Sequence, residues 1–254
     1  MSKVSIVVPS YNESGNVVNL VEQIDAALTG IDHEIIFVDD STDNTPEVIE
    51  GIIKDKPHVR LKHRTSEKGL ATAVILGFSL AEGDYLAVMD ADLQHPPAIL
   101  RPMFAVMEDG ADFCIPSRFI PGGSDGGLNL YRKFVSGTAR YIGKIALPCL
   151  RKITDPTSGL FMFRRECIKN ADMKPIGWKI MVEVLATADY KKVVEIPYKF
   201  QDRTAGESKL SSKVTMEYLQ QVAELMKRGK KQRGMVVNKL SEEEVKALEN
   251  KYGI

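Results

Sequence analysis

Short apolar runs rich in β-branched residues alternate, in the first half of the chain, with segments whose apolar residues recur at helical spacing. The runs Val4–Val8, Glu34–Val38 and Tyr85–Met89 predict buried strands, and Val17–Leu28 and Pro46–Lys54 predict helices between them. The alternation continues through Val59–Lys62, Gly69–Ala81, Pro97–Met107 and Asp112–Pro116. This pattern predicts an α/β fold with right-handed crossovers and a mainly parallel sheet. Ligands bind at the carboxyl ends of the strands in such sheets, so we expect function at that edge.

Beyond about residue 130 the alternation gives way to longer elements. The predicted elements are helices at Tyr131–Leu147 and Lys179–Asp189 and a strand at Lys191–Phe200. From Lys213 onward, apolar residues at helical spacing precede a group of Lys and Arg residues, which predicts an amphipathic helix with a basic end. Two alternatives stay open for this helix: it lies in the interface of an anionic membrane, or its apolar face packs on the rest of the fold and its basic end is solvated. Ser241 followed by Glu244 is a capping-box pattern, so we expect a short final helix after it.

Composition narrows the class of protein. With 254 residues, of which 44% are hydrophobic and 27% charged, the chain can bury a full core. Its 34 basic and 34 acidic residues cancel, which argues against nucleic acid as a partner. Three scattered cysteines make a poor disulfide framework and favour a reducing compartment. We find neither a signal peptide nor a membrane span in the sequence, and expect a cytoplasmic protein at the cytosolic face of a membrane.

The acidic sequence Asp90-Ala91-Asp92-Leu93-Gln94-His95 follows the apolar strand that ends at Met89. Asp90 and Asp92 point the same way in an extended chain. Carboxylate and amide oxygens suit Mg²⁺ or Mn²⁺, which also take oxygens from a diphosphate such as that of a nucleotide sugar. A solvated turn is the alternative reading of Asp-x-Asp, but its position at a strand end favours a metal site. A single His beside two prolines, as at His95, is more often a structural turn residue than a ligand.

Two other predicted strand ends carry polar residues. Asp39 and Asp40 follow the second strand, where a carboxylate can accept hydrogen bonds from a base or ribose, or one of the pair can cap the next helix. After the first strand, Tyr11 can stack on a base and Glu13 can accept from it. Neither a GxGxxG nor a Walker A loop is present there, which disfavours dehydrogenases and P-loop proteins.

Taken together and in this order, six segments of the sequence resemble family 2 glycosyltransferases, and within them the dolichol-phosphate mannose synthases. The segments are Val-Val-Pro-Ser-Tyr-Asn-Glu, Val-Asp-Asp-Ser, Met-Asp-Ala-Asp-Leu-Gln-His-Pro-Pro, Ser-Arg-Phe, Asp-Pro-Thr-Ser-Gly-Leu-Phe and Gly-Glu-Ser-Lys-Leu. The similarity covers roughly residues 3–226. It implies a GT-A fold and an inverting transfer of a hexose, mannose from GDP-mannose, to dolichyl or polyprenyl phosphate. A small membrane partner subunit is also compatible with it.

The resemblance also implies a set of site residues. It assigns to metal binding Asp92 and Gln94. It assigns to the nucleotide and its diphosphate Pro9, Tyr11, Glu13, Val38, Asp40, Asp90, Ala91 and Asp92. It assigns to phosphate and sugar contacts Arg118, Lys179, Arg203 and Lys209, with Arg132 and Ser136 toward the lipid phosphate. Among these, the catalytic residues we predict are Asp92, Arg118 and Arg203. The expected organisation is a GT-A catalytic domain in residues 1–212, an amphipathic helix with a basic end in 213–233 as a candidate membrane-interface element, and a short helix or tail in 234–254.

Several readings of the chemistry stay open at this point. A phosphate monoester is already an oxyanion at neutral pH, so transfer to it needs no strong general base. Transfer to a hydroxyl would need a carboxylate base, and the candidates after residue 130 are Asp155, Glu166 and Glu183. We expect Asp155 to support the structure in the first place. The alternatives are another donor such as UDP-glucose, a hydroxyl acceptor, or a non-catalytic nucleotide-sugar-binding subunit.

Overall fold

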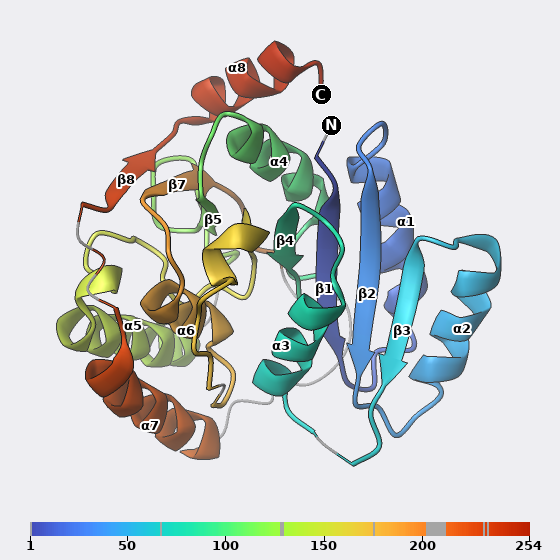
Figure 1. The fold of residues 1–254 in the computed structure, drawn as a ribbon, viewed down its shortest axis with the longest axis horizontal. Helices are drawn as coiled ribbons and strands as arrows, with labels where there is room; N and C mark the ends of the chain where they lie inside the picture. The colour runs from blue at the N-terminus through green and yellow to red at the C-terminus, as the bar shows by residue number, and fades with distance from the viewer. Residues whose placement is uncertain are drawn as a thin grey trace.

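In the computed structural model, one mainly parallel sheet runs through the molecule (Figure 1). The structure describes residues 2–66, 68–127, 130–174, 176–201, 212–230, 232 and 234–254, with the backbone alone for 130–136 and 212–213. Within these residues, eight strands are ordered β3-β2-β1-β4-β6-β5-β7-β8. Their bounds are β1 Val4–Ser10, β2 His33–Asp39, β3 Val59–His63, β4 Tyr85–Val88, β5 Phe113–Ser117, β6 Phe161–Arg164, β7 Lys192–Pro197 and β8 Val236–Lys239.

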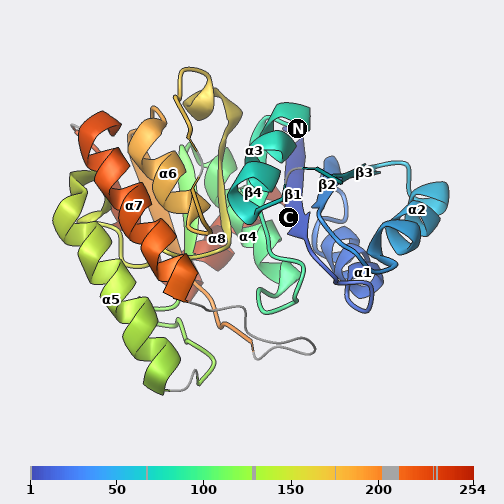
Figure 2. The ribbon, with the colours of Figure 1, turned by 90° about the horizontal axis from the view of Figure 1, so that it is seen from below.

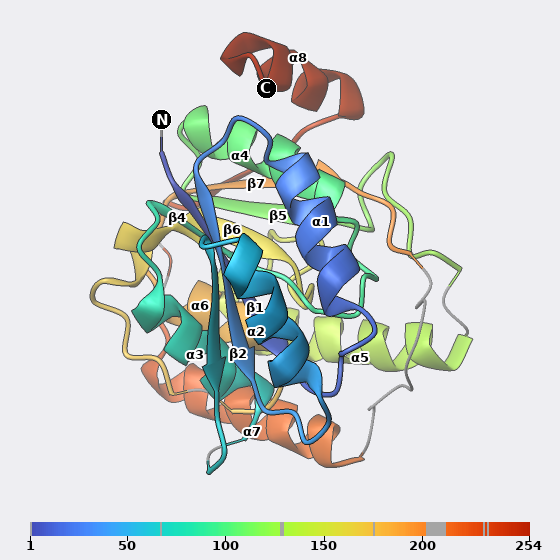
Figure 3. The same cartoon turned by 90° about the vertical axis from the view of Figure 1, so that its right-hand side faces the viewer.

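Helices cover both faces of the sheet, so that the molecule has three layers (Figures 2 and 3). The α-helices of the described chain are α1 Val17–Ala27, α2 Thr45–Asp55, α3 Leu70–Leu80, α4 Leu100–Glu108, α5 Leu130–Ala146, α6 Ile180–Thr187, α7 Ser212–Arg228 and α8 Glu242–Tyr252. One apolar cluster joins the sheet to α3, α6 and α7, and the other joins it to α1, α4 and α8. Because both faces are buried, the central strands are continuous apolar runs rather than alternating ones.

The register of the central strands aligns their ends. β1 pairs in parallel with β2 and with β4, and Val4 lies opposite both His33 and Tyr85. β1 and β2 therefore end together at Ser10 and Asp39, and β4 ends at Val88, opposite Val7, on the same side of the sheet, which is its lower edge in Figure 1. The α/β fold and the mainly parallel sheet that the sequence predicts are confirmed, and the functional residues it predicts begin at this edge.

Two strands escaped the sequence pattern. β6 lies antiparallel between β4 and β5, and its four residues come just after Pro156 and Gly159. β8 pairs in parallel with β7 and is largely exposed, so it carries no apolar signal. The final helix α8 has the predicted capping box at Ser241 and packs against α4. Residues 234–254, expected as a helix or tail, thus add a strand to the sheet and a helix to its cover.

The predicted amphipathic helix is α7, and its apolar face is turned inward. Tyr218, Val222 and Leu225 are buried in the cluster shared with α6. Arg228, at the basic end, donates to the fully buried carboxylate of Glu183 at 2.6 Å. The helix is therefore anchored to the rest of the fold at its carboxyl end. No helix in the described part of the chain is both long and apolar enough to cross a membrane.

Candidate active site at the carboxyl edge of the sheet

A cleft of about 260 Å³ opens at the carboxyl ends of β1, β2 and β4. Seven residues predicted from the sequence line it together: Pro9, Tyr11, Glu13, Asp40, Asp90, Ala91 and Asp92. Tyr11 is 40% exposed, as a ring available to stack on a base would be. Val38 is fully buried in the apolar cluster beneath and does not line the cleft, so its predicted contact with the nucleotide stays a prediction.

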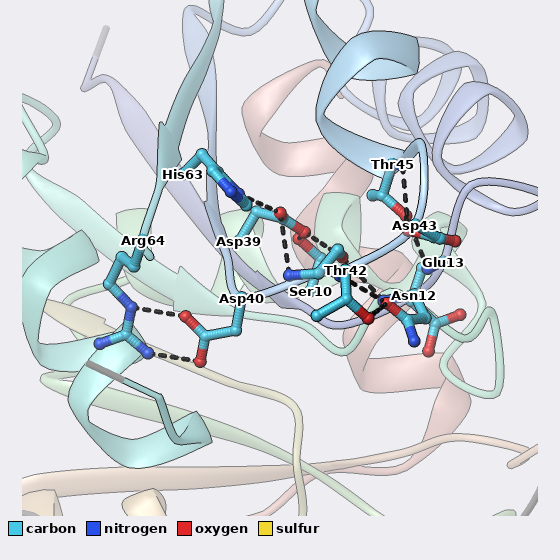
Figure 4. A network of polar contacts seen from close by, with 11 residues as sticks. Ser10, Asn12, Glu13, Asp39, Asp40, Thr42, Asp43, Thr45, His63 and Arg64 are labelled. Carbon is cyan, nitrogen blue, oxygen red and sulfur yellow. Dashed lines mark hydrogen bonds and ion pairs between the residues drawn. The ribbon is translucent and has the colours of Figure 1, made fainter. Parts of the chain in front are cut away.

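The loops after β1 and β2 are tied to each other by hydrogen bonds (Figure 4). Asn12 lies in the left-handed region at φ 57°. Its backbone N–H donates to Ser41 Oγ at 2.7 Å, and its side-chain Oδ1 accepts from the Thr42 backbone N–H at 2.9 Å. Asp39 is buried and accepts from Ser10 Oγ at 2.7 Å. The start of α2 uses neither acid of the predicted pair: Asp43 accepts from the Thr45 N–H. The shape of the cleft floor is thus fixed by two interlocked loops.

Asp40 is held by an arginine that the sequence did not single out. Arg64 Nε donates to Asp40 Oδ1 at 2.7 Å and Arg64 Nη2 donates to Oδ2 at 2.6 Å, and both side chains are buried (Figure 4). The Gly69 N–H donates to the same carboxylate at 2.8 Å. Because these donors occupy both oxygens, Asp40 fixes the loop that carries Lys68 and Gly69 into the cleft wall. Its predicted contact with base or ribose would have to share these oxygens.

The acidic loop after β4 has the donor set that a magnesium or manganese ion requires. Asp92 and Gln94 are both buried, while the side chain of Asp90 is 35% exposed. Leu93 takes the left-handed conformation at φ 58°, which bends the loop between them. Gln94 Nε2 is directed at the Gln201 carbonyl oxygen, at 3.4 Å. This contact assigns the nitrogen end of the amide and leaves the oxygen end as an available ligand, so the residues present fit the predicted metal.

His95 is a buried structural residue at the back of this loop. Its Nδ1 lies 3.2 Å from the Tyr198 hydroxyl, and its ring stacks on Tyr198 and meets Phe200 edge-on. Burial lowers the pKa of His95 to about 4, and although Asp92 acts in the opposite direction, the imidazole is neutral at pH 7. Its Nε2 lies 3.8 Å from Asp90 Oδ2. These contacts agree with the turn role expected for a His beside two prolines.

The segment from Asp155 to Gly159 closes on the acidic loop from the second half of the chain. A Cβ on Gly159 would lie 2.4 Å from Asp90 Oδ2 and 3.3 Å from His95 Nε2. A side chain at this position would therefore displace the Asp90 carboxylate. The sequence showed Gly159 only as part of a turn, because the contact joins residues that are far apart in the chain.

Arg118 is positioned by Asp155. Arg118 Nε donates to Asp155 Oδ2 at 2.7 Å and Arg118 Nη2 donates to Oδ1 at 2.9 Å, with Asp155 fully buried. The Asp155 turn is held in turn by Glu195 of β7, which accepts from the N–H groups of Thr154 and Asp155. Burial alone would lower the pKa of Arg118, but the bonds and charge of Asp155 outweigh it, so the pKa is raised.

Lys179 lies close to this pair. Burial lowers the pKa of Lys179, and the charge of Arg118 lowers it further, whereas Asp90 and Asp155 act in the opposite direction. Lys179 Nζ donates to the Thr157 carbonyl at 3.4 Å. Two cations predicted from the sequence therefore stand together beside the acidic loop. Such a pair is suited to a diphosphate, whose oxygens carry more than one negative charge.

Four predicted site residues cannot be placed. Arg203 and Lys209 lie outside the described residues, and for Arg132 and Ser136 in α5 the structure describes the backbone alone. Conversely, the cleft is lined by Lys68 and Trp178, which the sequence did not single out. Lys68 Nζ lies 5.9 Å from the centroid of the Tyr11 ring. An isolated Lys in a polar loop carries no signal of its own, and only the fold brings it to Tyr11.

Comparison with known proteins decides the family. The model of glycosyl transferase family 2 matches residues 5–171. The chain belongs to glycosyl transferase family 2. The family resemblance read from the motifs is thereby confirmed, and the matched region contains the acidic loop, Arg118, Asp155 and the residues that line the cleft, Trp178 excepted.

Several curated relatives are similar over most of this chain. It is 45% identical over 226 residues to a dolichol-phosphate mannosyltransferase of Pyrococcus furiosus, covering 89% of this chain and 64% of that one. It is 38% identical to the dolichol-phosphate mannosyltransferase of Saccharomyces cerevisiae, covering 87% and 86% of the two chains. It is 31% identical to a polyprenol monophosphomannose synthase of Mycolicibacterium smegmatis, covering 91% and 90%. The chain thus spans under two thirds of the Pyrococcus relative and most of the other two.

Solved structures share the fold at low sequence identity. Glucosyl-3-phosphoglycerate synthase from Mycobacterium tuberculosis in complex with UDP superimposes with a TM-score of 0.64 at 17% identity, covering 89% of this chain and 80% of that one. The same enzyme with Mn²⁺, UDP-glucose and phosphoglyceric acid gives a TM-score of 0.66 at 16% identity, covering 89% and 79%. These matches support the GT-A-like arrangement of the sheet and its helices.

Proposed function

We propose that this protein transfers mannose from GDP-mannose, with inversion, to the phosphate of a dolichyl or polyprenyl phosphate. Three relatives that are 31–45% identical are named for mannosyl transfer to dolichol phosphate or for the synthesis of polyprenol monophosphomannose. The cleft, with an acidic loop beside two cations, is suited to a nucleoside diphosphate held through a divalent metal. GDP as the nucleotide and mannose as the sugar rest on the relatives.

The choice of a phosphate acceptor rests on one observation: three carboxylates that could act as a base are either paired with an arginine or far from the acidic loop. A hydroxyl acceptor would need a base, and Asp155, Glu166 and Glu183 were the candidates. Asp155 is fully buried and occupied by Arg118. Glu183 is fully buried and occupied by Arg228. Glu166 follows β6 where it pairs with the start of β4, at the opposite edge of the sheet from Asp90.

Because none of those three carboxylates is placed to act as a general base, an acceptor that needs no base is favoured. The second pKa of a phosphate monoester is about 6, so the acceptor oxygen is already negative at neutral pH. Catalysis then rests on holding that oxygen behind the anomeric carbon and on neutralising the departing diphosphate. In this proposal a bound Mg²⁺ or Mn²⁺ supplies charge neutralisation, held by Asp92 and Gln94.

The cations take the remaining charge. Arg118 is fixed by Asp155, and Lys179 stands beside it. We keep Arg203 and Lys209 as further diphosphate contacts and Arg132 with Ser136 as contacts of the lipid phosphate, on the strength of the family resemblance. Asp155 acts through Arg118 in this scheme, in agreement with the supporting role expected from the sequence.

A matrix of two donors and two acceptors tests the proposal. Radiolabelled GDP-mannose and UDP-glucose are each incubated with a short polyprenyl phosphate and with the corresponding polyprenol, in the presence of Mg²⁺. We expect label in lipid from GDP-mannose and polyprenyl phosphate alone. Label transferred from UDP-glucose would show that the proposed donor is wrong, and label in the polyprenol would show that the proposed acceptor is wrong. A folded protein that binds nucleotide but labels neither acceptor would favour a binding subunit.

We further propose that α5 and α7 meet the surface of the membrane that holds the lipid acceptor. The two helices lie side by side (Figure 2), and the Tyr218 hydroxyl of α7 donates to the Ala139 carbonyl of α5 at 2.8 Å. Although α7 buries one apolar face, large apolar side chains on both helices stay exposed. They are Tyr141 at 61%, Ile145 at 76%, Met216 at 66%, Leu219 at 39% and Met226 at 63%.

These exposed side chains form stripes. Tyr141 and Ile145 are four residues apart, and Met216, Leu219 and Met226 recur on one side of α7, so each helix has a second apolar strip. Lys227, whose side chain is 75% exposed and pairs with Glu224 at 3.6 Å, lies beside Met226. An apolar strip with adjacent Lys suits the interface of an anionic membrane. Three free buried cysteines fit the reducing, cytosolic side of such a membrane.

Liposome flotation of the full chain tests this contact. Truncation before α7 would remove Tyr218, Val222 and Leu225 from the core, so substitutions on the exposed strip are preferable. The double variant Ile145→Gln, Met226→Gln should float with anionic liposomes less than the unchanged protein. Val18→Gln, at a 45% exposed position on α1 across the sheet, is the matched control and should float normally. Equal flotation of all three proteins would refute the contact.

A further inference from the structure

A cluster of nitrogen and oxygen ligand atoms lies at the edge of the sheet opposite the cleft. It consists of Asp25 near the end of α1, His33 at the start of β2 and His58 just before β3. Asp25 Oδ1 is 3.1 Å from His33 Nε2 and 2.8 Å from His58 Nε2. Since β2 begins at His33 and ends at Asp39, this cluster is about 20 Å along the strand from the cleft.

The orientation of His33 demands an explanation. Its Nδ1 lies 2.9 Å from the Ile31 carbonyl oxygen, which can only accept, so Nδ1 must carry a proton. In neutral imidazole the other nitrogen, Nε2, then has a lone pair and no proton. That lone pair would be directed at a carboxylate oxygen 3.1 Å away. Two acceptors repel at this distance, so the arrangement is stable only with a second proton on the ring or with a cation between the two atoms.

This is the arrangement in which metal-binding histidines are held. A ligating imidazole donates its other N–H to a carbonyl or carboxylate, which fixes the ring and its tautomer. Bonds of about 2.0–2.1 Å at tetrahedral angles separate ligand atoms by roughly 3.3 Å. The separations of 3.1 and 2.8 Å are within a few tenths of an ångström of that value. The three ligand atoms lie within 4.8 Å of one another, so only small side-chain movements are needed.

The surroundings of the cluster leave it accessible. Lys56 pairs with the other carboxylate oxygen, Asp25 Oδ2, at 2.5 Å and leaves Oδ1 to the two histidines. Burial alone would raise the pKa of Asp25, but its partners, Lys56 foremost, lower it overall, so the carboxylate is ionised at neutral pH. Side-chain exposures of 13–32% leave one side of the cluster open to water. The three cysteines are all buried and do not compete for a metal.

We propose that Asp25, His33 and His58 bind a transition-metal ion, Zn²⁺ foremost, with water in the fourth position. Two imidazoles and one carboxylate suit zinc, whereas the oxygen donors of Asp92 and Gln94 suit Mg²⁺ or Mn²⁺. The ion joins the end of α1, the start of β2 and the turn between α2 and β3. It therefore cross-links three elements in the half of the fold that carries Tyr11 and Asp40. This site is independent of the proposed transfer reaction.

Competition with a chromophoric chelator measures the binding. Metal-free protein is titrated with Zn²⁺ in excess Mg²⁺, which keeps the oxygen ligands near Asp92 occupied. We expect one Zn²⁺ per chain. Loss of a group that only hydrogen-bonds a metal ligand weakens metal binding ~10- to 100-fold. His33→Gln and His58→Gln each remove a ligand itself, so they should weaken Zn²⁺ binding by at least that factor. His63→Gln is the matched control, because His63 is an exposed histidine bonded to Asp39 at the other end of β2.

Thermal melting provides the second readout and checks folding. Zn²⁺ should raise the Tm of the unchanged protein and of His63→Gln. The Tm of His58→Gln should be the same with and without Zn²⁺. The variant Asp92→Ala should bind Zn²⁺ as the unchanged protein does. Absence of binding to the unchanged protein would overturn the proposal. Equal Zn²⁺ affinity in His33→Gln, His58→Gln and His63→Gln would also overturn it, because the ion would then bind elsewhere. Loss of Zn²⁺ binding in Asp92→Ala would overturn it as well, because it would place the ion at the acidic loop.

Discussion

Replacing Gly159 by Ala should damage catalysis through a single methyl group. That methyl carbon would lie 2.4 Å from Asp90 Oδ2, where ordinary contact begins at 3.4 Å, so the carboxylate has to withdraw by about 1 Å. His95 Nε2, at 3.3 Å, limits the room for relief because His95 is buried against Tyr198. A misplacement of about 1 Å in a catalytic arrangement costs ~10²-fold in rate. We therefore expect kcat/KM to fall by about 10²-fold, equivalent to about 2.7 kcal/mol.

The assay is steady-state transfer of mannose from GDP-mannose to a short polyprenyl phosphate, with melting temperatures measured in parallel. Gly51→Ala is the matched control: Gly51 lies within α2, and a Cβ there meets nothing within 4 Å. The control should keep full activity and gain up to about 1 kcal/mol of stability. If Gly159→Ala has the activity of the unchanged protein while it stays folded, the contact with Asp90 does not matter to catalysis and the reasoning fails.

Three further changes probe the polar interior. Arg64→Met should weaken binding of GDP at least about tenfold in calorimetry, because it removes the two charge-assisted bonds that orient Asp40; unchanged binding would deny Asp40 a part in shaping the cleft. Arg228→Met should lower the free energy of unfolding in urea by about 3–5 kcal/mol by leaving Glu183 buried without its partner, and a loss below 1 kcal/mol would contradict this. Burial alone would raise the pKa of Glu34, but hydrogen bonds lower it overall from 4.5, so its contribution to stability is present above that pH and is lost as the pH falls. Glu34→Gln should accordingly flatten the acid limb of the stability curve, and an unchanged limb would refute this assignment.

The first half of the fold was readable from the sequence because its strands are buried on both faces. β1, β2 and β4 are continuous apolar runs, and their ends carry the polar residues that line the cleft. Strand-end position alone was enough to bring Tyr11, Asp40 and Asp92 together, because parallel strands in register end at one edge. The family resemblance added Arg118, which follows β5, and Lys179, which lies in the second half of the chain.

What the sequence did not predict depends on long-range contacts. β6 and β8 have four residues each, too few to show a period, and β8 is mostly exposed. The bidentate pairs Arg64–Asp40 and Arg118–Asp155 join residues 24 and 37 positions apart, and nothing in the local pattern matches a cation to its carboxylate. The inward face of α7 was one of two open alternatives, because an amphipathic stripe does not say which surface it meets.

The measurement that tests the central claim most directly is transfer of radiolabel from GDP-mannose to polyprenyl phosphate, with Mg²⁺ or Mn²⁺ present or chelated, in the unchanged protein and in Asp92→Ala. Asp92 is buried in the acidic loop and lines the cleft, so its loss should remove the metal and leave the fold intact. We predict labelled lipid from the unchanged protein with metal, and none after chelation or in Asp92→Ala. Labelled lipid that persists without metal, or in folded Asp92→Ala, would contradict the account.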